Sequence, residues 1–270
     1  MNEMKPAASH ATEPSEPRIS PLWLRWFTFY GERYVRKHFH ALRLCQSAPP
    51  VPSNPLVVYL NHASWWDPMV CLALRRRFFA HRASYAPIDA VALRRYPFFR
   101  KLGFFPVEQQ AHRGTVAFLE GASRVLARSD SMLWLTPQGR FADVRDTSVG
   151  LRTGMAHLAT RVNVATYLPL ALEYAFWEER MPEACINFGE PMVVTREQAA
   201  KTGARGLTAL FEEKLRAAQQ QLAAAVIRRD ASQLRVLDRQ RVGVGGVYDV
   251  WRRFRSLMRQ ESFRPEHGTK

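Results

Sequence analysis

The sequence predicts an α/β protein in which helices flank a mixed, mostly parallel β-sheet. From residue 55 onward, short apolar runs alternate with helical stretches of roughly 10 to 15 residues, the pattern of a sheet covered by helices. Apolar residues make up 47% of the 270-residue chain, enough for a sizeable buried core. An amphipathic helical segment is predicted on each side of this region, one near each end of the chain.

The chain is strongly basic. Its 39 Lys and Arg residues against 24 Asp and Glu give a formal charge of +15, which favours nucleic acid, an acidic membrane surface or phosphate-bearing substrates as partners. The cysteines Cys45, Cys71 and Cys185 stand far apart without a CxxC motif. They are interpreted as reduced, buried thiols, and the histidine spacing predicts no metal site.

Composition divides the chain into four predicted segments. Residues 1–17 are polar and proline-containing and lack an apolar signal segment, so a disordered tail is expected. Residues 18–46 are predicted to be an amphipathic membrane-interface helix, 47–229 the core, and 230–270 a basic helical extension. The proline-rich stretch 47–55 marks the first boundary. No run of about 20 apolar residues is present, so no spanning helix is expected.

The helix predicted over residues 21–44 carries Trp23, Trp26, Tyr30 and Tyr34 on a wide apolar face. Its basic residues gather toward the C-terminal half. Aromatic and basic residues on one amphipathic helix are typical of a helix lying in a membrane interface. A helix that packs on the protein core is the alternative. Both interpretations also apply to the basic stretch that begins near residue 247.

The core elements follow from the local patterns. Helices are predicted at 68–78, 89–102, 114–128, 150–161 and 205–229. Strands are predicted at 56–60, 81–88, 103–108, 131–137, 163–174 and 185–194.

The first core strand leads to a histidine and an aspartate. A strand that ends at Leu60 delivers Asn61 and His62 to the carboxyl edge of the sheet, where α/β proteins place ligands. Asp67 followed by proline is typical of a helix N-cap. A carboxylate there would also orient His62, as in serine hydrolases. The sequence lacks GxSxG and a reactive cysteine, so this pair implies that the substrate supplies the hydroxyl.

The segment His62–Asp67 matches the HxxxxD block of the glycerolipid acyltransferases, the family of bacterial 1-acylglycerol-3-phosphate acyltransferases, and Asn61 completes their NHxxxxD form. KLGFFPVE (101–108) resembles the family's second block, Gly-x-x-Phe-Ile-x-Arg. WLTPQGRF (134–141) resembles the third, Phe-Pro-Glu-Gly-Thr-Arg, and YLPLALEY (167–174) the fourth. The resemblance spans about residues 55 to 200. It implies a glycerol-3-phosphate acyltransferase-like fold.

Three positions depart from the family pattern. Gln109 stands at the usual arginine of the second block, Gln138 at the usual glutamate of the third, and Phe141 at its arginine. In the family these charged positions are associated with the glycerol phosphate of the acceptor. Arg113 and Arg140 are the candidates to replace them, because arginine is long and forks onto phosphate.

The resemblance implies acyl transfer from acyl-CoA or acyl-carrier protein, with no bound cofactor and no metal. His62 would act as general base and Asp67 would orient it. Backbone amides at Gly139 or at the helix start after Pro68 would stabilise the oxyanion. The predicted substrate-binding residues are Asn61, Trp65, Trp66, Gln109, Arg113, Gln138, Gly139, Arg140 and Phe141.

The sequence is compatible with three functions. The first is acyl transfer to a lysophospholipid such as 1-acylglycerol-3-phosphate, and the second is the same reaction on a phosphate-free lipid such as an ornithine lipid, a glycolipid or a carotenoid glycoside. The third is that of a non-catalytic basic protein that binds membrane or nucleic acid. For the enzyme, the expected partners are the lipid acceptor, an anionic membrane surface and acyl-carrier protein, with no nucleic acid. It would lie peripherally on the cytoplasmic side of the inner membrane.

Overall fold

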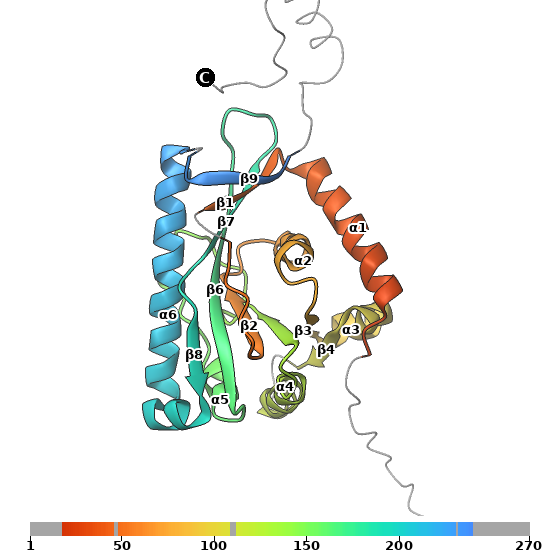
Figure 1. Ribbon diagram of the computed structural model, residues 1–270, viewed down its shortest axis with the longest axis vertical. Helices are drawn as coiled ribbons and strands as arrows, with labels where there is room; N and C mark the ends of the chain where they lie inside the picture. The colour runs from red at the N-terminus through yellow and green to blue at the C-terminus, as the bar shows by residue number, and fades with distance from the viewer. Residues whose placement is uncertain (1–17, 46–47, 109–111, 231, 240–270) are drawn as a thin grey trace, which may run out of the picture.

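The computed structural model describes residues 18–239 apart from 46–47, 109–111 and 231. Over this part of the chain, nine strands form one sheet in the order β4-β3-β5-β2-β6-β7-β1-β9, with β8 paired to β6 (Figure 1). The strands are β1 (Ala41–Cys45), β2 (Leu56–Leu60), β3 (Ala83–Asp89), β4 (Phe104–Val107), β5 (Ser131–Leu135), β6 (Val164–Ala175), β7 (Glu183–Phe188), β8 (Met192–Thr195) and β9 (Leu234–Arg239).

The helices lie on both faces of this sheet. They are α1 (Pro21–His38), α2 (Asp67–Phe78), α3 (Ala90–Arg95), the 3₁₀ helix η1 (Pro97–Leu102), α4 (His112–Val125), α5 (Gly154–Ala159) and α6 (Arg196–Arg228). Strands β4, β3, β5, β2 and β6 run parallel, as do β7 and β1, whereas β6–β7, β6–β8 and β1–β9 are antiparallel. The predicted mixed, mostly parallel sheet is therefore confirmed.

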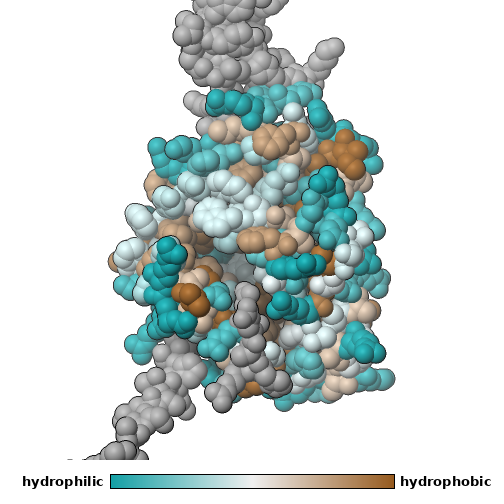
Figure 2. Space-filling view, turned by 180° about the vertical axis from the view of Figure 1, so that it is seen from behind, coloured by the Kyte–Doolittle hydropathy of each residue, from teal (hydrophilic) through white to brown (hydrophobic). Residues whose placement is uncertain are grey.

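Side-chain alternation along the strands divides the core into two layers. On β2, Leu56, Val58 and Leu60 pack with α1 and α2, while Val57 and Tyr59 pack with α4, α5 and α6. Figure 1 shows α6 on one side of the sheet and α1 and α2 on the other. Both faces are covered, which explains why β2 and β5 are continuous apolar runs. The face in Figure 2, opposite to that of Figure 1, mixes hydrophilic and hydrophobic residues.

The predicted helix over residues 21–44 is too long. It ends at His38, and residues 41–45 form β1, which pairs with β7 and β9. Helix propensity in HALRL is overridden because β7 and β9 offer this segment a hydrogen-bonding partner on each side. Likewise, the sequence predicts a helical appendage from residue 230 onward, whereas 234–239 form β9. The sheet thus extends across both predicted segment boundaries.

Helix α1 has a buried face and an exposed aromatic face. Leu24, Phe27, Thr28, Gly31 and Val35 are buried, and a side chain added at Gly31 would contact Leu72 and Met69 of α2. Gly31 therefore lies against α2, where an added Cβ would make only ordinary van der Waals contacts. The opposite face exposes aromatic residues. α1 therefore packs on the core, which is the alternative given for this segment in the sequence analysis. It also exposes an aromatic surface.

Smaller corrections concern the C-terminal half. The strand predicted over 185–194 is divided at Gly189, whose N–H donates to the Pro169 carbonyl, into β7 and β8. α6 begins at Arg196 rather than 205, with a capping box between Thr195 and Gln198, and kinks at Gly203, which has φ +73°. The predicted tail 1–17 and the basic segment after 239 lie outside the described residues. Among the described helices, none combines the length and apolarity needed to cross a bilayer.

A buried ionic cluster joins β1 to β7. The Glu183 carboxylate accepts hydrogen bonds from His40 Nδ1 at 2.6 Å and from Arg43 Nε at 2.9 Å, and Arg43 also lies over the Trp177 ring. Burial would raise the pKa of Glu183, but these hydrogen bonds and the charge of Arg43 outweigh it, so the pKa is lowered. The stability that Glu183 contributes is therefore present above the ordinary glutamate pKa and is lost as pH falls through the folded value.

We expect Glu183→Ala to lower the free energy of unfolding by about 3–5 kcal/mol, because it leaves Arg43 buried without its carboxylate. Urea denaturation at neutral pH measures this. Glu120→Ala, which removes a half-exposed partner of Arg124, is the control. An equal loss in both variants would contradict a structural role for the cluster.

Candidate active site

The structure brings His62 and Asp67 together. His62 lies in the loop between β2 and α2, and Asp67 is the first residue of α2. His62 Nδ1 is 2.7 Å from Asp67 Oδ2. The Asp67 side chain is only 2% exposed, whereas that of His62 is 20% exposed. A carboxylate accepts the hydrogen bond, so Nδ1 carries a proton, and in the neutral imidazole Nε2 then retains its lone pair.

Asp67 is held by two further donors. Its Oδ2 accepts the Ser64 N–H at 3.1 Å, and its Oδ1 accepts the Tyr174 hydroxyl at 2.7 Å. Burial, followed by the charge of Asp67, raises the pKa of Tyr174 well above its ordinary value, so this hydroxyl stays protonated. Asp67 was predicted to be an N-cap, but Trp66 occupies that position and no side chain caps the helix. The carboxylate is oriented toward the loop instead.

The backbone of His62 is fixed from both sides. Its N–H donates to Gln138 Oε1 at 2.7 Å, and its carbonyl accepts the Ala142 N–H at 2.9 Å. These contacts join the β2–α2 loop to the loop that follows β5. Gln138, predicted to bind substrate, therefore positions the histidine through its side-chain oxygen.

Asn61 anchors the end of β2 to β6. The backbone ladder between these strands ends at Leu60 and Leu170. Beyond it, the side-chain amide of Asn61 bonds to the backbone of β6. Its Nδ2 donates to the Leu172 carbonyl at 2.9 Å and its Oδ1 accepts the Leu172 N–H at 2.8 Å. Asn61 is 2% exposed. These contacts favour a structural role over the predicted substrate-binding role.

Phe141 and Gly139 shape the other side of the imidazole. The Phe141 ring lies over His62 with 4.1 Å between ring centroids and is 57% exposed. Gly139 adopts φ +67°, and a Cβ there would lie 2.5 Å from the guanidinium carbon of Arg152. Glycine therefore allows Arg152 to approach this loop. Arg140 is exposed.

The two suggested sources of oxyanion donors are already engaged. The Gly139 N–H donates to the Thr136 carbonyl at 3.0 Å. At the start of α2, the N–H groups of Met69 and Val70 donate to the Trp66 carbonyl. Neither of these amide groups is available without a rearrangement.

The two tryptophans of the motif contact α1. The Trp66 ring packs on Phe39 and Tyr34, with centroid separations of 4.9 and 5.2 Å. Trp65 lies 6.4 Å from Tyr34 and is 59% exposed. These contacts hold the β2–α2 loop against α1 and against Phe39, which follows that helix. Gln109 lies outside the described residues, and for Arg113 only the backbone, in α4, is described.

A cavity of about 310 Å³ opens beside His62, between α2 and the strands β2, β3 and β5. Apolar residues from six elements line most of it: Leu24, Leu60, Leu72, Leu102, Phe104 and Trp134. A wider depression of about 630 Å³ adjoins it across Ile88, Leu135 and Thr136 and is bordered by Gly139 and Arg152. The imidazole thus stands beside an apolar cavity that adjoins a more polar depression.

Sequence reasoning missed Tyr174 and Arg152. Tyr174 was identifiable in principle, because it shares the period-two face of Leu168, Leu170 and Leu172, the face of β6 that packs toward α2. Arg152 carries no comparable signal. Its approach to Gly139 depends on the fold of the loop over 136–153.

We expect Asn61→Ala to lower the free energy of unfolding by about 2 kcal/mol or more, because both backbone groups of Leu172 lose a buried partner. Thermal unfolding measures this, with the exposed Asn163→Ala as the control. Equal unfolding midpoints for the two variants would show that the hydrogen bonds between Asn61 and Leu172 contribute nothing to stability.

Residues 27–173 match the acyltransferase family. The fold is similar to the crystal structure of the 1-acyl-sn-glycerophosphate (LPA) acyltransferase PlsC from Thermotoga maritima, with a TM-score of 0.51 and 17% sequence identity over 74% of this chain and 80% of that one. No curated protein sequence matches the chain. Since the family match covers more than half of its length, the protein belongs to the acyltransferase family.

Proposed function

We propose that the protein transfers a fatty acyl group from acyl-CoA or acyl-carrier protein to the hydroxyl of a lipid acceptor, with His62 as general base. The observation that carries this proposal is the 2.7 Å contact between His62 Nδ1 and the buried Asp67. His62 Nε2 takes the proton of the acceptor hydroxyl while that oxygen attacks the thioester carbon. The C–S bond then breaks, and the imidazolium returns the proton to the departing thiolate.

The apolar cavity beside His62 supports an assignment as the acyl-chain site. Its lining is mostly hydrocarbon and it is bordered by the imidazole, so a chain inside it would leave the thioester near His62. Cys71 also lines it. Burial, followed by the charge of Asp67, raises the pKa of the Cys71 thiol. A protonated thiol is a poor nucleophile, so the cysteine would not intercept the acyl group.

The wider depression supports a lysophospholipid acceptor such as 1-acylglycerol-3-phosphate. Arg152 borders it, and a guanidinium binds phosphate through paired hydrogen bonds. The alternative is a phosphate-free acceptor. Phe141 and Gln138 favour that alternative, because neither carries the charge that the family usually has at these positions. The Phe141 ring lies over His62, and the Gln138 side chain accepts the His62 N–H.

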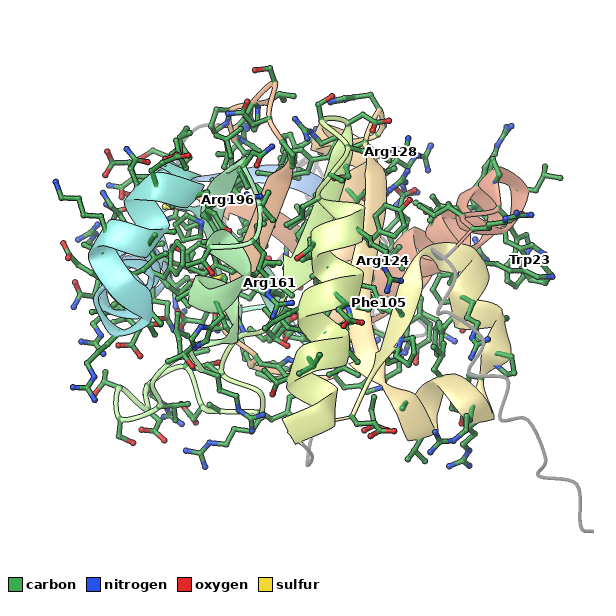
Figure 3. All side chains as sticks on the ribbon, turned by 90° about the horizontal axis from the view of Figure 1, so that it is seen from below. Trp23, Phe105, Arg124, Arg128, Arg161 and Arg196 are labelled. Carbon is green, nitrogen blue, oxygen red and sulfur yellow. The ribbon has the colours of Figure 1, made fainter. Side chains whose placement is uncertain are left out.

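An exposed aromatic ridge supports docking to a membrane. Along α1, the ring centroids of Trp23, Trp26, Tyr30 and Tyr34 follow one another at 5.9, 6.0 and 5.7 Å, and Trp65 of the catalytic loop follows Tyr34. Figure 3 shows Trp23 at the outer side of α1, pointing away from the body. Aromatic rings of this kind prefer the headgroup region of a bilayer. The ridge would place the His62 loop at the cytoplasmic surface of the inner membrane. Acyl-carrier protein, being acidic, would also suit the basic surface.

We expect His62→Ala to reduce the rate of acyl transfer by about 10²- to 10⁴-fold. Asp67→Asn should act in the same direction because it loses the carboxylate that orients the imidazole, and Tyr174→Phe should cause a smaller loss. The assay measures labelled acyl-CoA consumed with lysophosphatidate or hydroxylated lipids. The control is the exposed His81→Ala, which should behave as wild type. Equal turnover in His62→Ala and His81→Ala would reject the catalytic role. Absence of turnover by the wild type would favour a non-catalytic membrane protein.

Arg152→Gln distinguishes the two acceptor classes. With a phosphate-bearing acceptor, we expect its KM to rise about 10-fold or more, because a charged hydrogen bond to phosphate is lost. The KM for acyl-CoA should change little. Lys201→Gln, at an exposed position on α6, is the control. Turnover confined to phosphate-free lipids, with no effect of Arg152→Gln, would support the alternative acceptor.

A further inference from the structure

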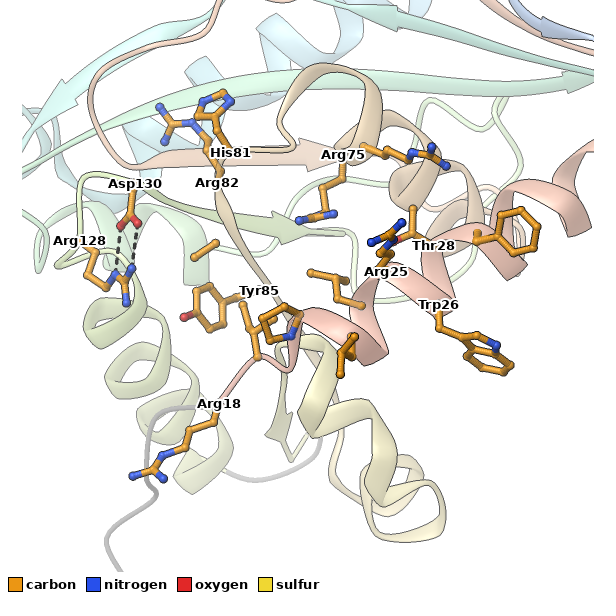
Figure 4. Close-up of a pocket in the computed structure, with 17 residues that line it drawn as sticks. Arg18, Arg25, Trp26, Thr28, Arg75, His81, Arg82, Tyr85, Arg128 and Asp130 are labelled. Carbon is orange, nitrogen blue, oxygen red and sulfur yellow. Dashed lines mark hydrogen bonds and ion pairs between the residues drawn. The ribbon is translucent and has the colours of Figure 1, made fainter.

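A second, larger groove lies at the other end of α2. Its volume is about 1390 Å³, and it is bordered by the N-terminal half of α1, the last turns of α2 and the start of β3 (Figure 4). His62 does not line this groove. α2 carries Asp67 at its first residue and Arg75 eight residues later, about 12 Å along the helix axis. The groove is therefore separate from the apolar cavity beside His62, although the two share a border at Leu24, Arg75 and Tyr85.

Several arginines line the groove, and three of them have partners. Arg76 is paired with Glu32, and Arg128 with Asp130, as the dashed lines in Figure 4 mark for the latter pair. The Arg82 guanidinium donates to backbone carbonyls, those of Pro52, Asn54, Ser129 and Ser131. These three cations are neutralised or hydrogen-bonded within the protein.

Arg25 and Arg75 differ from these three. Within the described residues, neither has a carboxylate at ion-pair distance, and the Arg75 Nε is buried with no hydrogen-bond partner. The two residues come from neighbouring helices and lie on the same side of the groove in Figure 4, with Arg128 and Asp130 across from them.

An incompletely paired, half-buried cation is costly. Burial favours the neutral form of Arg75 and lowers its pKa, and desolvation of a guanidinium is offset only by hydrogen bonds or an opposite charge. A bound anion would provide both. Two guanidinium groups from two helices match the several oxygens of a phosphate, which each arginine can bind through paired N–H groups.

We propose that Arg25 and Arg75 bind the phosphate of an anionic phospholipid headgroup in this groove, at a site distinct from the catalytic one. The walls favour a lipid over a free phosphate ion. Leu22, Trp26 and Phe29 of α1 line the groove and are 79%, 58% and 61% exposed. The acyl chains of a phospholipid would cover these apolar side chains and remove them from water, which a free phosphate ion cannot do.

The groove is continuous with the aromatic ridge. Trp26 belongs to both, since it lines the groove and stacks on Tyr30. A headgroup held by Arg25 and Arg75 would thus lie at the level where the ridge enters the bilayer. The lipid site rests on the proposed membrane docking, but it does not depend on which acceptor is acylated.

The test measures binding of the full chain to vesicles of phosphatidylcholine with and without phosphatidylglycerol. We expect the double variant Arg25→Gln/Arg75→Gln to bind phosphatidylglycerol vesicles about 30-fold more weakly, which corresponds to about 1 kcal/mol for each arginine. The charge-matched control is Arg205→Gln/Arg216→Gln, at exposed positions on α6. It should lose less than about threefold, since its charges face away from the bilayer and are screened.

A second measurement, thermal unfolding, distinguishes a lipid ligand from free phosphate and shows whether the variant is folded. Monomeric short-chain phosphatidylglycerol should raise the thermal unfolding midpoint of the wild type and leave that of Arg25→Gln/Arg75→Gln unchanged, while inorganic phosphate at the same concentration raises neither. Equal vesicle affinity of the wild type and this variant, equal losses in both double variants, or equal stabilisation by inorganic phosphate would each overturn the proposal. His62→Ala should bind vesicles as the wild type does, so a failed acyl-transfer assay and a failed lipid site remain distinguishable.

Discussion

The buried carboxylate of Asp67 is the constraint on which the site depends. It accepts hydrogen bonds from His62, from the backbone of its own loop and from Tyr174 on β6. Two of these donors lie in the β2–α2 loop and the third lies on the sheet, so one side chain at the start of α2 joins the loop, the helix and the sheet. A carboxylate that is only 2% exposed needs these partners, because an ionised group without them is costly to bury.

The two helices packed on one face of the sheet link this carboxylate to the surfaces around it. α2 carries Asp67 at its start and Arg75 toward its end, while α1 covers α2 and exposes the aromatic ridge. The two helices pack against each other at Gly31 of α1 and Leu72 and Met69 of α2. The apolar cavity, the basic groove and the ridge are consequently all built on the same helix pair. The proposed membrane docking and the proposed lipid site therefore both involve this helix pair.

Much of the fold and part of the site could be predicted from the sequence. Apolar runs such as LVVYL identify buried strands, and His62 and Asp67 are close because a short loop joins β2 to α2. Residues 41–45 and 234–239 were missed because they become strands only by pairing with distant partners. Side-chain roles were predicted less well. The sequence places Asn61 and Gln138 beside His62 but does not reveal that both are engaged with backbone groups, nor that Arg152 lies against Gly139.

Asp67 holds His62 so that the neutral ring carries its proton on Nδ1 and keeps the lone pair on Nε2. Nitrogen-15 NMR of the imidazole, assigned by comparison with His62→Gln, reports the tautomer directly. We predict a protonated Nδ1 and an unprotonated Nε2 in the neutral ring of the free enzyme, and loss of this preference in Asp67→Asn. A neutral ring protonated at Nε2 would contradict it, because that nitrogen has no lone pair with which to accept a proton from an alcohol.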